Sequence, residues 1–164
     1  MAEAGGIRVG IGYDSHRFAA EGSGRALVLG GVEVPGAPGL EGHSDADALT
    51  HAVIDALLGA CGLGDLGAHF PPDDERWRDA DSLGLLERAL EMLGATPLNV
   101  DATVVCEAPR LSEHREAMQD SLSRVISAPV SVKATTNEGM GWVGRGEGIA
   151  CLAVALVSAN QAGP

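Results

Sequence analysis

Apolar residues in this chain follow two spacings, an alternation with a period of about two and a helical repeat of about 3.6, which predicts both strands and helices. Segments that alternate, or that are apolar throughout, predict strands at 7–13, 26–34, 98–106, 130–134 and 148–157. Segments with helical spacing predict helices at about 47–61, 82–93 and 112–127. The glycine pair Gly30–Gly31 is expected to break the second strand into a hairpin or bend.

Polar residues and glycines mark the ends of the predicted helices. Ser44, Asp45 and Asp47 are candidate N-caps of the first helix, and Gly94 is expected to cap the second. The segment 65–74 has no apolar period and is expected to be a mobile loop. The core-facing residues of the second and third helices are expected to be Leu83, Leu86, Leu90, Leu93, Met118, Leu122, Val125 and Ile126.

The segment 148–157 decides how the sheet is packed. Nearly every residue in it is apolar, which favours a strand buried on both faces, although its Ala and Leu content also suits a C-terminal helix. About three helices are too few to cover both faces of a sheet, so we expect them on one face and other subunits on the other. The sequence therefore predicts an α+β fold with a mixed β-sheet in an obligate oligomer.

Composition limits the classes of partner. The chain has 164 residues and a net charge of −12, which disfavours nucleic acid as a partner. A phosphorylated ligand would have to be bound by divalent cations, Arg side chains or backbone N–H groups within the site itself. Three cysteines without a C-x-x-C pair fit a reducing compartment, so we expect a cytoplasmic protein. No apolar run reaches membrane-spanning length, and no membrane partner is expected.

Two short segments carry residues suited to metal binding. Asp14 and His16 follow the first predicted strand at i, i+2 spacing, which places both side chains on one face if the strand continues. His51 lies on the first predicted helix. One carboxylate and two imidazoles would form a three-ligand site with an open fourth position, as in catalytic zinc sites. The simpler alternative is that His51 is a solvated or core-packed histidine.

His51 also belongs to a polar stripe with Asp47 and Asp55, at i, i+4 and i+8. The stripe is either a solvent-exposed face of the helix or a pair of carboxylates that orient His51 from behind. The spacing alone does not separate these alternatives.

A glycine-rich segment at 133–148 combines hydroxyl, carboxylate and guanidinium groups. Thr135, Thr136 and exposed backbone N–H groups are suitable donors to phosphate oxygens. Glu138 could ligate a hard cation such as Mg²⁺, and Arg145 stands between glycines, where its guanidinium can approach an anion. The alternative is a glycine-rich turn with a solvated Glu and Arg. The segment matches neither a Walker A loop nor a dinucleotide fingerprint.

Taken together, these segments resemble the 2-C-methyl-D-erythritol 2,4-cyclodiphosphate synthase family. The matching motifs are Gly12-Tyr13-Asp14-Ser15-His16, His43-Ser44-Asp45-Ala46-Asp47, Leu49–Ala52, Asp55–Ala60, Gly64–Gly67, His69–Pro72, Lys133–Thr136 and Gly144–Ala150. The resemblance covers residues 7–158, which implies a single domain with flexible ends at 1–6 and 159–164. It also implies a homotrimer, with active sites between neighbouring subunits and one sheet face packed inside the trimer.

The implied reaction converts 4-diphosphocytidyl-2-C-methyl-D-erythritol 2-phosphate to 2-C-methyl-D-erythritol 2,4-cyclodiphosphate and CMP in the non-mevalonate isoprenoid pathway. The implied cofactors are Zn²⁺ on Asp14, His16 and His51, and Mg²⁺ or Mn²⁺ held with help from Glu138. By the same resemblance, His43 and Thr136 are catalytic, His43 with Ser44 gripping phosphate and Thr136 stabilising transition-state charge.

The resemblance also assigns the substrate contacts. Those to phosphate and the methylerythritol group fall on Ser44, Asp65, Leu66, Gly67, Phe70, Pro71, Pro72, Asp73 and Asp74. Those to cytidine and the rest of the site fall on Cys106, Ala108, Pro109, Arg110, Leu111, Ser112, Thr135, Asn137, Glu138, Trp142 and Arg145. Arg110 stands where the family commonly has Lys, which keeps the charge and changes its geometry.

Two other functions are compatible with the same residues. The first is a zinc-dependent phosphohydrolase, in which Asp55 or Asp65 would be the base that activates water. The second is a trimeric module that binds an isoprenoid diphosphate in its central cavity through Arg145. Product analysis distinguishes the phosphohydrolase from a cyclase, because a cyclase forms the cyclic diphosphate and CMP and a hydrolase forms linear phosphates. Failure to turn over the cytidyl substrate would favour the binding module.

Overall fold

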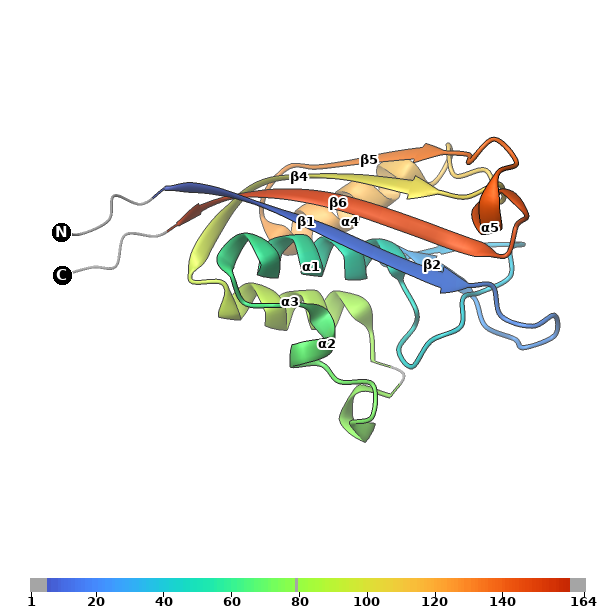
Figure 1. Ribbon diagram of the computed structural model, residues 1–164, viewed down its shortest axis with the longest axis horizontal. Helices are drawn as coiled ribbons and strands as arrows, with labels where there is room; N and C mark the ends of the chain where they lie inside the picture. Colours follow the sequence, from blue (N-terminus) through green and yellow to red (C-terminus); the bar gives the residue numbers. More distant parts are fainter. Residues whose placement is uncertain (1–5, 79, 160–164) are drawn as a thin grey trace.

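The structure is a computed structural model that describes residues 6–78 and 80–159. Four strands form one sheet in the order β1-β6-β4-β5 (Figure 1). They are β1 (Ile7–Arg17), β6 (Gly148–Ala159), β4 (Ala95–Val105) and β5 (Val130–Thr135). β4 and β5 are parallel and the other pairs are antiparallel, which confirms the predicted mixed sheet. The predicted hairpin at Gly30–Gly31 is also present, as β2 (Leu27–Leu29) and β3 (Val32–Val34).

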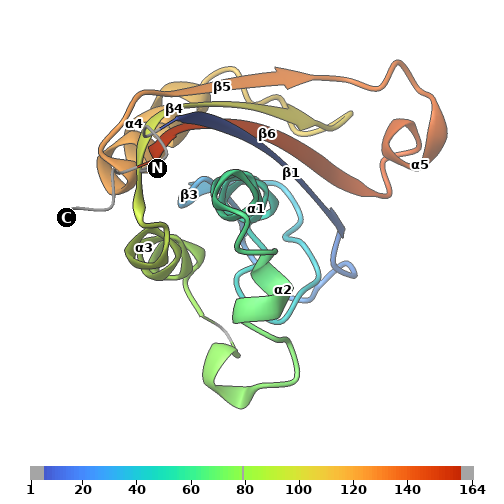
Figure 2. The same ribbon diagram turned by 60° about the vertical axis from the view of Figure 1, so that its left-hand side comes forward.

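The longer helices lie on one side of the sheet, and Figure 2 shows the opposite side without cover. They are α1 (Ala48–Cys61), α3 (Ser82–Met92) and α4 (Arg115–Ile126). This confirms the α+β fold with about three helices on one face. The shorter helices are α2 (Leu66–His69), the 3-10 helix η1 (Glu75–Trp77) and α5 (Gly141–Gly144). Among the described residues, no helix has the length and apolar character needed to cross a membrane.

The uncovered face of the sheet carries large apolar side chains. In the antiparallel register of β1 and β6, Ile11 pairs with Val154 and Tyr13 with Leu152. Ile11 is 71% exposed, and the other three are 39% to 54% exposed. With Ile7 and Val9 they form an exposed apolar patch along the two strands, which we call the apolar sheet face. The apolar sheet face is exposed because β6 is apolar on both faces and the helices cover only one of them.

The buried face of β1 lies unusually close to α1, because glycines stand at the points of contact. A β-carbon on Gly10 would lie 2.0 Å from the carbonyl oxygen of Ala56, and one on Gly12 would lie 1.9 Å from that of Ala52. No other residue fits there without moving the helix. Because side chains alternate along a strand, Asp14 and His16 continue the same face toward the start of α1.

Asp47 fixes the start of α1, and its buried carboxylate is bonded to groups other than the His51 imidazole. Its carboxylate accepts the backbone N–H of Thr50 at 2.9 Å and those of Gly30 and Gly31 at 2.8 and 2.7 Å. It also accepts the Thr50 hydroxyl at 2.7 Å. Burial raises the pKa of Asp47, although these hydrogen bonds act in the opposite direction. Asp47 is thus the N-cap among the three candidates, and both interpretations of the polar stripe were wrong for it.

The segment 65–74, expected to be a mobile loop, contains the short helix α2. Asp65 caps α2 by accepting the N–H of Ala68 at 2.9 Å. Phe70 is 7% exposed and packs edge-to-face against Trp77, with ring centroids 5.1 Å apart. A four-residue helix is too short to show an apolar period, so the sequence pattern did not reveal it.

The ends and faces of the other elements mostly follow the predictions. The strand favoured at 148–157 is confirmed, because β1 and β4 pair with β6 on both sides. On α3, Leu85 and Ala89 are buried, whereas Leu83 and Leu90, predicted to face inward, are only partly buried. At the chain ends, Ala159 belongs to β6 and donates its N–H to the Gly6 carbonyl at 3.0 Å. The remainder of the flexible ends expected at 1–6 and 159–164 lies outside the described residues.

Candidate active site

Three side chains from two elements meet at one point. Asp14 and His16 project from the same face of β1, and His51 projects from α1. One carboxylate oxygen of Asp14 lies 2.9 Å from His16 Nε2 and 3.0 Å from His51 Nδ1. The two imidazole nitrogens are 3.4 Å apart. The predicted metal ligands therefore converge, each offering one donor atom within 4.8 Å of the others.

Hydrogen bonds on the far sides of the two imidazoles fix where their protons lie. His16 Nδ1 is 2.6 Å from the Glu41 carbonyl oxygen, which can only accept, so this nitrogen carries the proton. Nε2 of a neutral His16 then presents a lone pair to Asp14.

The same reasoning applies to His51. Its Nε2 is 2.9 Å from the Ser82 hydroxyl oxygen, and the single Ser82 proton is directed to the carboxylate of Asp45. Ser82 must therefore accept from Nε2–H of His51, which leaves a lone pair on Nδ1. When both imidazoles are neutral, three lone-pair-bearing atoms face one another, and such a set is stable only around a positive charge, either a metal ion or a proton.

The donor set fits a divalent transition metal. Two neutral imidazoles and one carboxylate match the three protein ligands of catalytic zinc, and hydrogen bonds hold the outer nitrogens of both rings. The proximity of the three side chains also shifts the pKa values of Asp14 and His16. Burial acts to raise the pKa of Asp14, but hydrogen bonds from His16 and His51 outweigh it and hold that pKa far below its usual range. Burial acts to lower the pKa of His16, but Asp14 outweighs it and the pKa is raised.

A pocket of about 310 Å³ opens beside these three side chains. Polar His43 and Ser44 line it together with a largely apolar wall. The predicted substrate contacts that line it are Ser44, Leu66, Gly67, Phe70 and Pro72, joined by Gly42, Trp77 and Leu85, which the sequence analysis did not single out. A site that combines hydrogen-bond donors with apolar side chains suits a phosphorylated ligand with a small carbon skeleton.

Four predicted contacts near this pocket do not line it. Pro71 and Asp73 are absent from its wall. Asp65 is the N-cap of α2, as described above. Asp74 caps η1 and forms an ion pair with Arg76 at 2.5 Å. The carboxylates at 65 and 74 are thus engaged in shaping the segment that carries Phe70.

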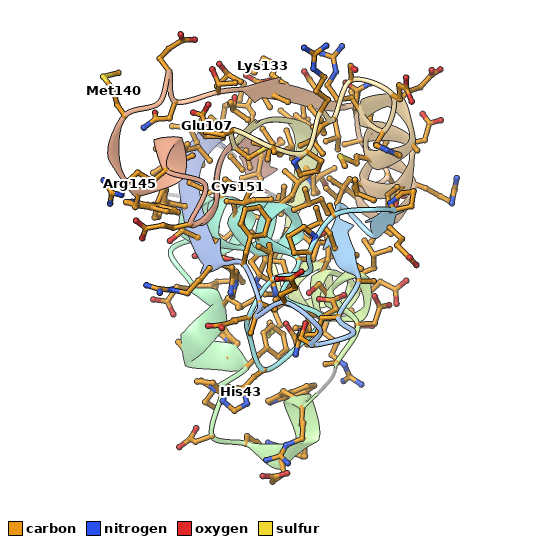
Figure 3. The ribbon with its side chains drawn as sticks, turned by 90° about the vertical axis from the view of Figure 1, so that its right-hand side faces the viewer. His43, Glu107, Lys133, Met140, Arg145 and Cys151 are labelled. Carbon is orange, nitrogen blue, oxygen red and sulfur yellow. The ribbon has the colours of Figure 1, made fainter. Side chains whose placement is uncertain are left out.

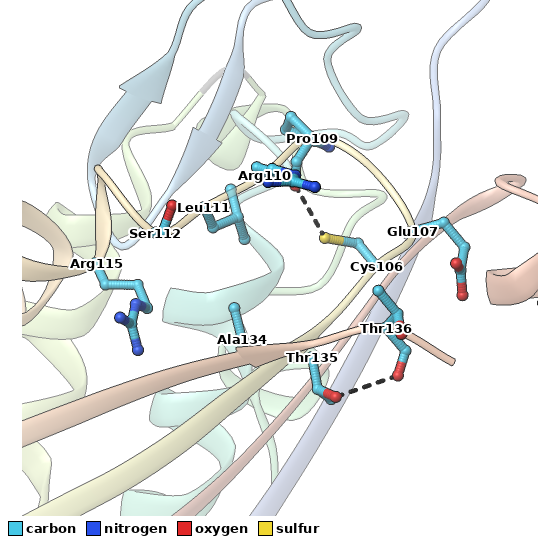
Figure 4. A pocket seen from close by; sticks show the side chains of 10 residues that line it. All are labelled: Cys106, Glu107, Pro109, Arg110, Leu111, Ser112, Arg115, Ala134, Thr135 and Thr136. Atoms are coloured by element: carbon cyan, nitrogen blue, oxygen red, sulfur yellow. Dashed lines mark hydrogen bonds between the residues drawn. The ribbon is translucent and has the colours of Figure 1, made fainter. Parts of the chain in front are cut away.

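A second pocket, of about 360 Å³, lies between the end of β5 and the segment that follows β4 (Figure 4). Two guanidinium groups, of Arg110 and Arg115, stand at this pocket, so it can hold an anionic ligand. The predicted residues Cys106, Pro109, Arg110, Leu111, Ser112, Thr135 and Thr136 line it, and Ala108 does not. Burial and the neighbouring Glu107 raise the pKa of Cys106 to about 11, so its thiol is neutral at pH 7.

Glu107 anchors the glycine-rich segment beside this second pocket. One of its oxygens accepts the backbone N–H of Asn137 at 2.8 Å and that of Gly139 at 3.3 Å. Glu138, between them, has a left-handed backbone with φ of 52°. The Thr136 hydroxyl donates to the Glu138 carboxylate at 3.0 Å. The segment is thus held by specific bonds, and the exposed Glu138 carboxylate is available to a ligand or cation.

Trp142 and Arg145 lie outside both pockets. Trp142 borders a separate depression with Ser15, His16 and Glu147. Arg145 donates from Nε to Glu147 at 2.7 Å. In a single chain, neither residue reaches the metal-ligand pocket or the Thr135–Thr136 pocket.

The two pockets lie in different places in one chain. They share no lining residue, and Figure 3 shows His43 far from Glu107 and Lys133. The predicted catalytic residues His43 and Thr136 are therefore not brought together within one subunit.

Comparisons with known proteins place these features in context. The sequence profile of the YgbB family matches residues 7–158. A 2-C-methyl-D-erythritol 2,4-cyclodiphosphate synthase of Rubrobacter xylanophilus is 55% identical over 158 residues, covering 93% of this chain and 96% of the relative. A protein of the same name from Salinibacter ruber is 55% identical over 157 residues, covering 92% and 98%.

Solved structures show the same likeness. A 2C-methyl-D-erythritol-2,4-cyclodiphosphate synthase in its CDP-bound form has a TM-score of 0.82 and 38% identity, covering 92% of this chain and 100% of that one. The Plasmodium falciparum IspF in complex with CDP has a TM-score of 0.80 and 31% identity, covering 95% and 98%.

Proposed function

The chain belongs to the YgbB family, and we propose from this premise that it works as a 2-C-methyl-D-erythritol 2,4-cyclodiphosphate synthase of the non-mevalonate isoprenoid pathway. It closes 4-diphosphocytidyl-2-C-methyl-D-erythritol 2-phosphate to the cyclic diphosphate and releases CMP. The observation that carries this function is the identity of 55% to named synthases over nearly their whole length. The resemblance first seen in the sequence motifs is thereby confirmed.

The reaction is an intramolecular phosphoryl transfer. An oxygen of the 2-phosphate forms a bond to the β-phosphorus, the bond from that phosphorus to the α-phosphate bridging oxygen breaks, and CMP leaves with the electron pair. Such a transfer needs alignment and neutralised charge more than it needs a protein nucleophile. The protein must therefore hold both ends of a folded substrate and supply positive charge between them.

Asp14, His16 and His51 would hold Zn²⁺, and Glu138 would help to hold Mg²⁺ or Mn²⁺. The bound metals would polarise and neutralise diphosphate oxygens. His43 and Ser44, which line the same pocket, donate hydrogen bonds to phosphate. The Thr136 hydroxyl stabilises charge that develops in the transition state.

Binding of the substrate divides between the two pockets. The apolar wall of Leu66, Phe70 and Trp77 receives the methylerythritol group. Contacts from Pro71, Asp73 and Asp74 belong to the same proposal. The pocket lined by Cys106, Arg110 and Thr135 receives cytidine. Contacts from Ala108 and Asn137 belong to the same proposal. Related synthases in CDP-bound form support a cytidine nucleotide as the ligand.

The active chain is a homotrimer in this proposal. Two observations support it, the bare apolar sheet face and the separation of the two pockets within one chain. Packing the apolar sheet faces of three subunits together would remove Ile11 and Val154 from water. It would also allow the metal-ligand pocket of one subunit to face the Thr135–Thr136 pocket of the next.

Further expectations belong to the same proposal. Residues 7–158 form a single domain, and the chain works in the cytoplasm, without nucleic acid or membrane as partner. Arg145, paired with Glu147 and close in sequence to Trp142, would line the central cavity of the trimer and could hold an isoprenoid diphosphate there. The net charge of −12 opposes binding of polyanions elsewhere on the surface.

The hydrolase alternative has less support. Asp55 accepts the N–H of Leu66 at 2.7 Å and Asp65 caps α2, so both candidate bases are used to build the segment at 65–70. Neither lines the pocket beside the metal ligands.

Phosphorus NMR of the reaction mixture tests the proposal. The chain is incubated with the cytidyl substrate, Zn²⁺ and Mg²⁺, and we expect resonances of the cyclic diphosphate together with CMP. Linear phosphates would instead indicate a hydrolase, and unchanged substrate would contradict the enzyme assignment.

A further inference from the structure

Ser82 lies behind His51, on the side of the ring that points away from the candidate metal site. Its hydroxyl donates to a carboxylate oxygen of Asp45 and accepts from His51 Nε2 at 2.9 Å. Ser82 has no exposed surface. The three groups thus form a continuous chain of carboxylate, hydroxyl and imidazole that ends at the lone pair on His51 Nδ1.

The start of α3 does not explain this hydroxyl. The N-cap of α3 is Asp81, whose side chain accepts the N–H of Leu83 at 3.3 Å. Ser82 follows the cap, and the helix would form without its hydroxyl. A buried hydroxyl is unfavourable unless it is hydrogen-bonded. The partners of the Ser82 hydroxyl are the His51 imidazole and the Asp45 carboxylate.

Asp45 is itself held in place. Besides the Ser82 hydroxyl, it accepts the backbone N–H of Ser82 at 3.0 Å and that of Asp47 at 3.2 Å. An ionised carboxylate can only accept hydrogen bonds, so Asp45 sets the direction of both bonds in the series Asp45–Ser82–His51. The Ser82 proton must point to Asp45, and the His51 proton must point to Ser82.

We propose that Ser82 and Asp45 are positioning residues that keep His51 with its proton on Nε2 and its lone pair on Nδ1, directed at the metal. This inference rests on the proposed metal site. Outer-sphere partners of this kind orient ligating imidazoles and contribute about 10-fold to 100-fold to metal affinity. Ser44 Oγ, 3.3 Å from the same nitrogen, offers only a longer bond and would replace Ser82 in part.

The experiment measures the zinc dissociation constant by competition with a chelator. We expect Ser82→Ala to weaken zinc binding about 10-fold to 100-fold. The matched control is Asp81→Ala, which removes the neighbouring helix cap without touching His51. It should lower the thermal stability of the metal-free protein and leave the zinc dissociation constant within about 2-fold of its starting value.

A second variant keeps the test decisive if Ser82→Ala does not fold. Asp45→Asn retains Ser82 but offers one oxygen to the three groups that now donate to Asp45, and it should also weaken zinc binding about 10-fold or more. The visible spectrum of the Co²⁺-substituted protein should change in these variants, because His51 is less firmly oriented, and should not change in Asp81→Ala.

Two outcomes would be distinguished from each other. If Ser82→Ala and Asp45→Asn bind zinc as tightly as the unaltered chain while His51→Ala does not, the positioning role is wrong and the metal site stands. If His51→Ala also binds zinc normally, the metal site itself is wrong, and the positioning role is overturned with it.

Discussion

Gly12 of β1 and Ala52 of α1 are in direct backbone contact. A β-carbon at Gly12 would lie 1.9 Å from the Ala52 carbonyl oxygen, so the helix can rest on the strand only because that position has no side chain. His51 precedes Ala52, and Asp14 lies on the same strand face as Gly12. The contact that brings the two elements together therefore also sets the distance of 3.0 Å between His51 Nδ1 and Asp14.

Gly12→Ala should disturb both the packing and the metal ligands. The added methyl must push α1 away from β1, and overpacking of this kind costs about 1–3 kcal/mol of unfolding free energy. Because the shift moves His51 from Asp14, zinc affinity should fall as well. Urea unfolding and chelator competition measure the two effects.

Gly59→Ala on the same helix is the matched control for Gly12→Ala. A β-carbon there would have no neighbour closer than 3.7 Å, and the residue is exposed. Replacing a glycine inside a helix by alanine favours folding by about 0.5–1 kcal/mol. If Gly12→Ala proved as harmless as Gly59→Ala, the close contact would not determine the site.

Asp47→Ala should destabilise the chain while leaving the metal ligands in place. The change removes the N-cap of α1 and leaves the N–H groups of Gly30, Gly31 and Thr50 without their acceptor. Together these losses should lower the unfolding free energy by about 2–4 kcal/mol. Chemical denaturation of the metal-free protein checks this, and a loss below about 0.5 kcal/mol would show that the carboxylate is not needed.

The unfolding free energy of the metal-free protein should depend on pH through Asp14 and His16. The pKa of Asp14 is lowered on folding, so its stabilising effect is present above its ordinary value of 3.8 and is lost as pH falls toward the folded value. The pKa of His16 is raised, so its effect is present below 6.5 and is lost as pH rises through the folded value.

The contribution of Asp14 and His16 to stability without metal should therefore be greatest between about pH 4 and 6.5 and should fall above this range. Zinc should reverse the trend at higher pH, because it binds the deprotonated imidazoles. Denaturation of chelator-treated protein across this range, with Asp14→Asn as control, measures the effect. The fall above pH 6.5 should be smaller in Asp14→Asn, since the partner that raises the His16 pKa is gone.

Complementation tests whether active sites form between subunits. His51→Ala removes a metal ligand and Thr136→Ala removes a hydroxyl of the other pocket, so each variant alone should be inactive or nearly so. If one subunit supplies the metal ligands and its neighbour supplies Thr136, co-expression of the two variants should restore roughly a quarter of the normal activity by random assembly. Activity no higher than that of the separate variants would indicate that each site belongs to one chain.

Much of the fold followed from local patterns. The alternation in β1 and the helical repeat of α1 placed Asp14, His16 and His51 on their elements, since period alone decides which side chains share a face. Periodicity did not show that the two elements touch. That depends on Gly10 and Gly12. From the sequence, the ligand types suggested a three-residue site, and the family resemblance assigned zinc to the same residues.

The residues that the sequence analysis missed contribute through groups without a distinctive pattern. Glu41 acts through a backbone carbonyl, and Ser82 is a small hydroxyl at a helix start, where serine is common. Asp47 was assigned to a polar stripe on spacing within the helix alone. Its actual partners, the N–H groups of the hairpin, lie 16 and 17 residues earlier in the chain. Such contacts depend on tertiary packing, which the spacing of residues within one helix cannot reveal.

The central claim is that Asp14, His16 and His51 together hold one metal ion on which ring closure depends. The most direct test is the zinc content and cyclic-diphosphate production of His51→Ala beside the unaltered chain. We predict about one zinc per chain for the unaltered protein, and loss of both zinc and turnover in the variant. A folded His51→Ala protein that kept full zinc and full turnover would contradict the account.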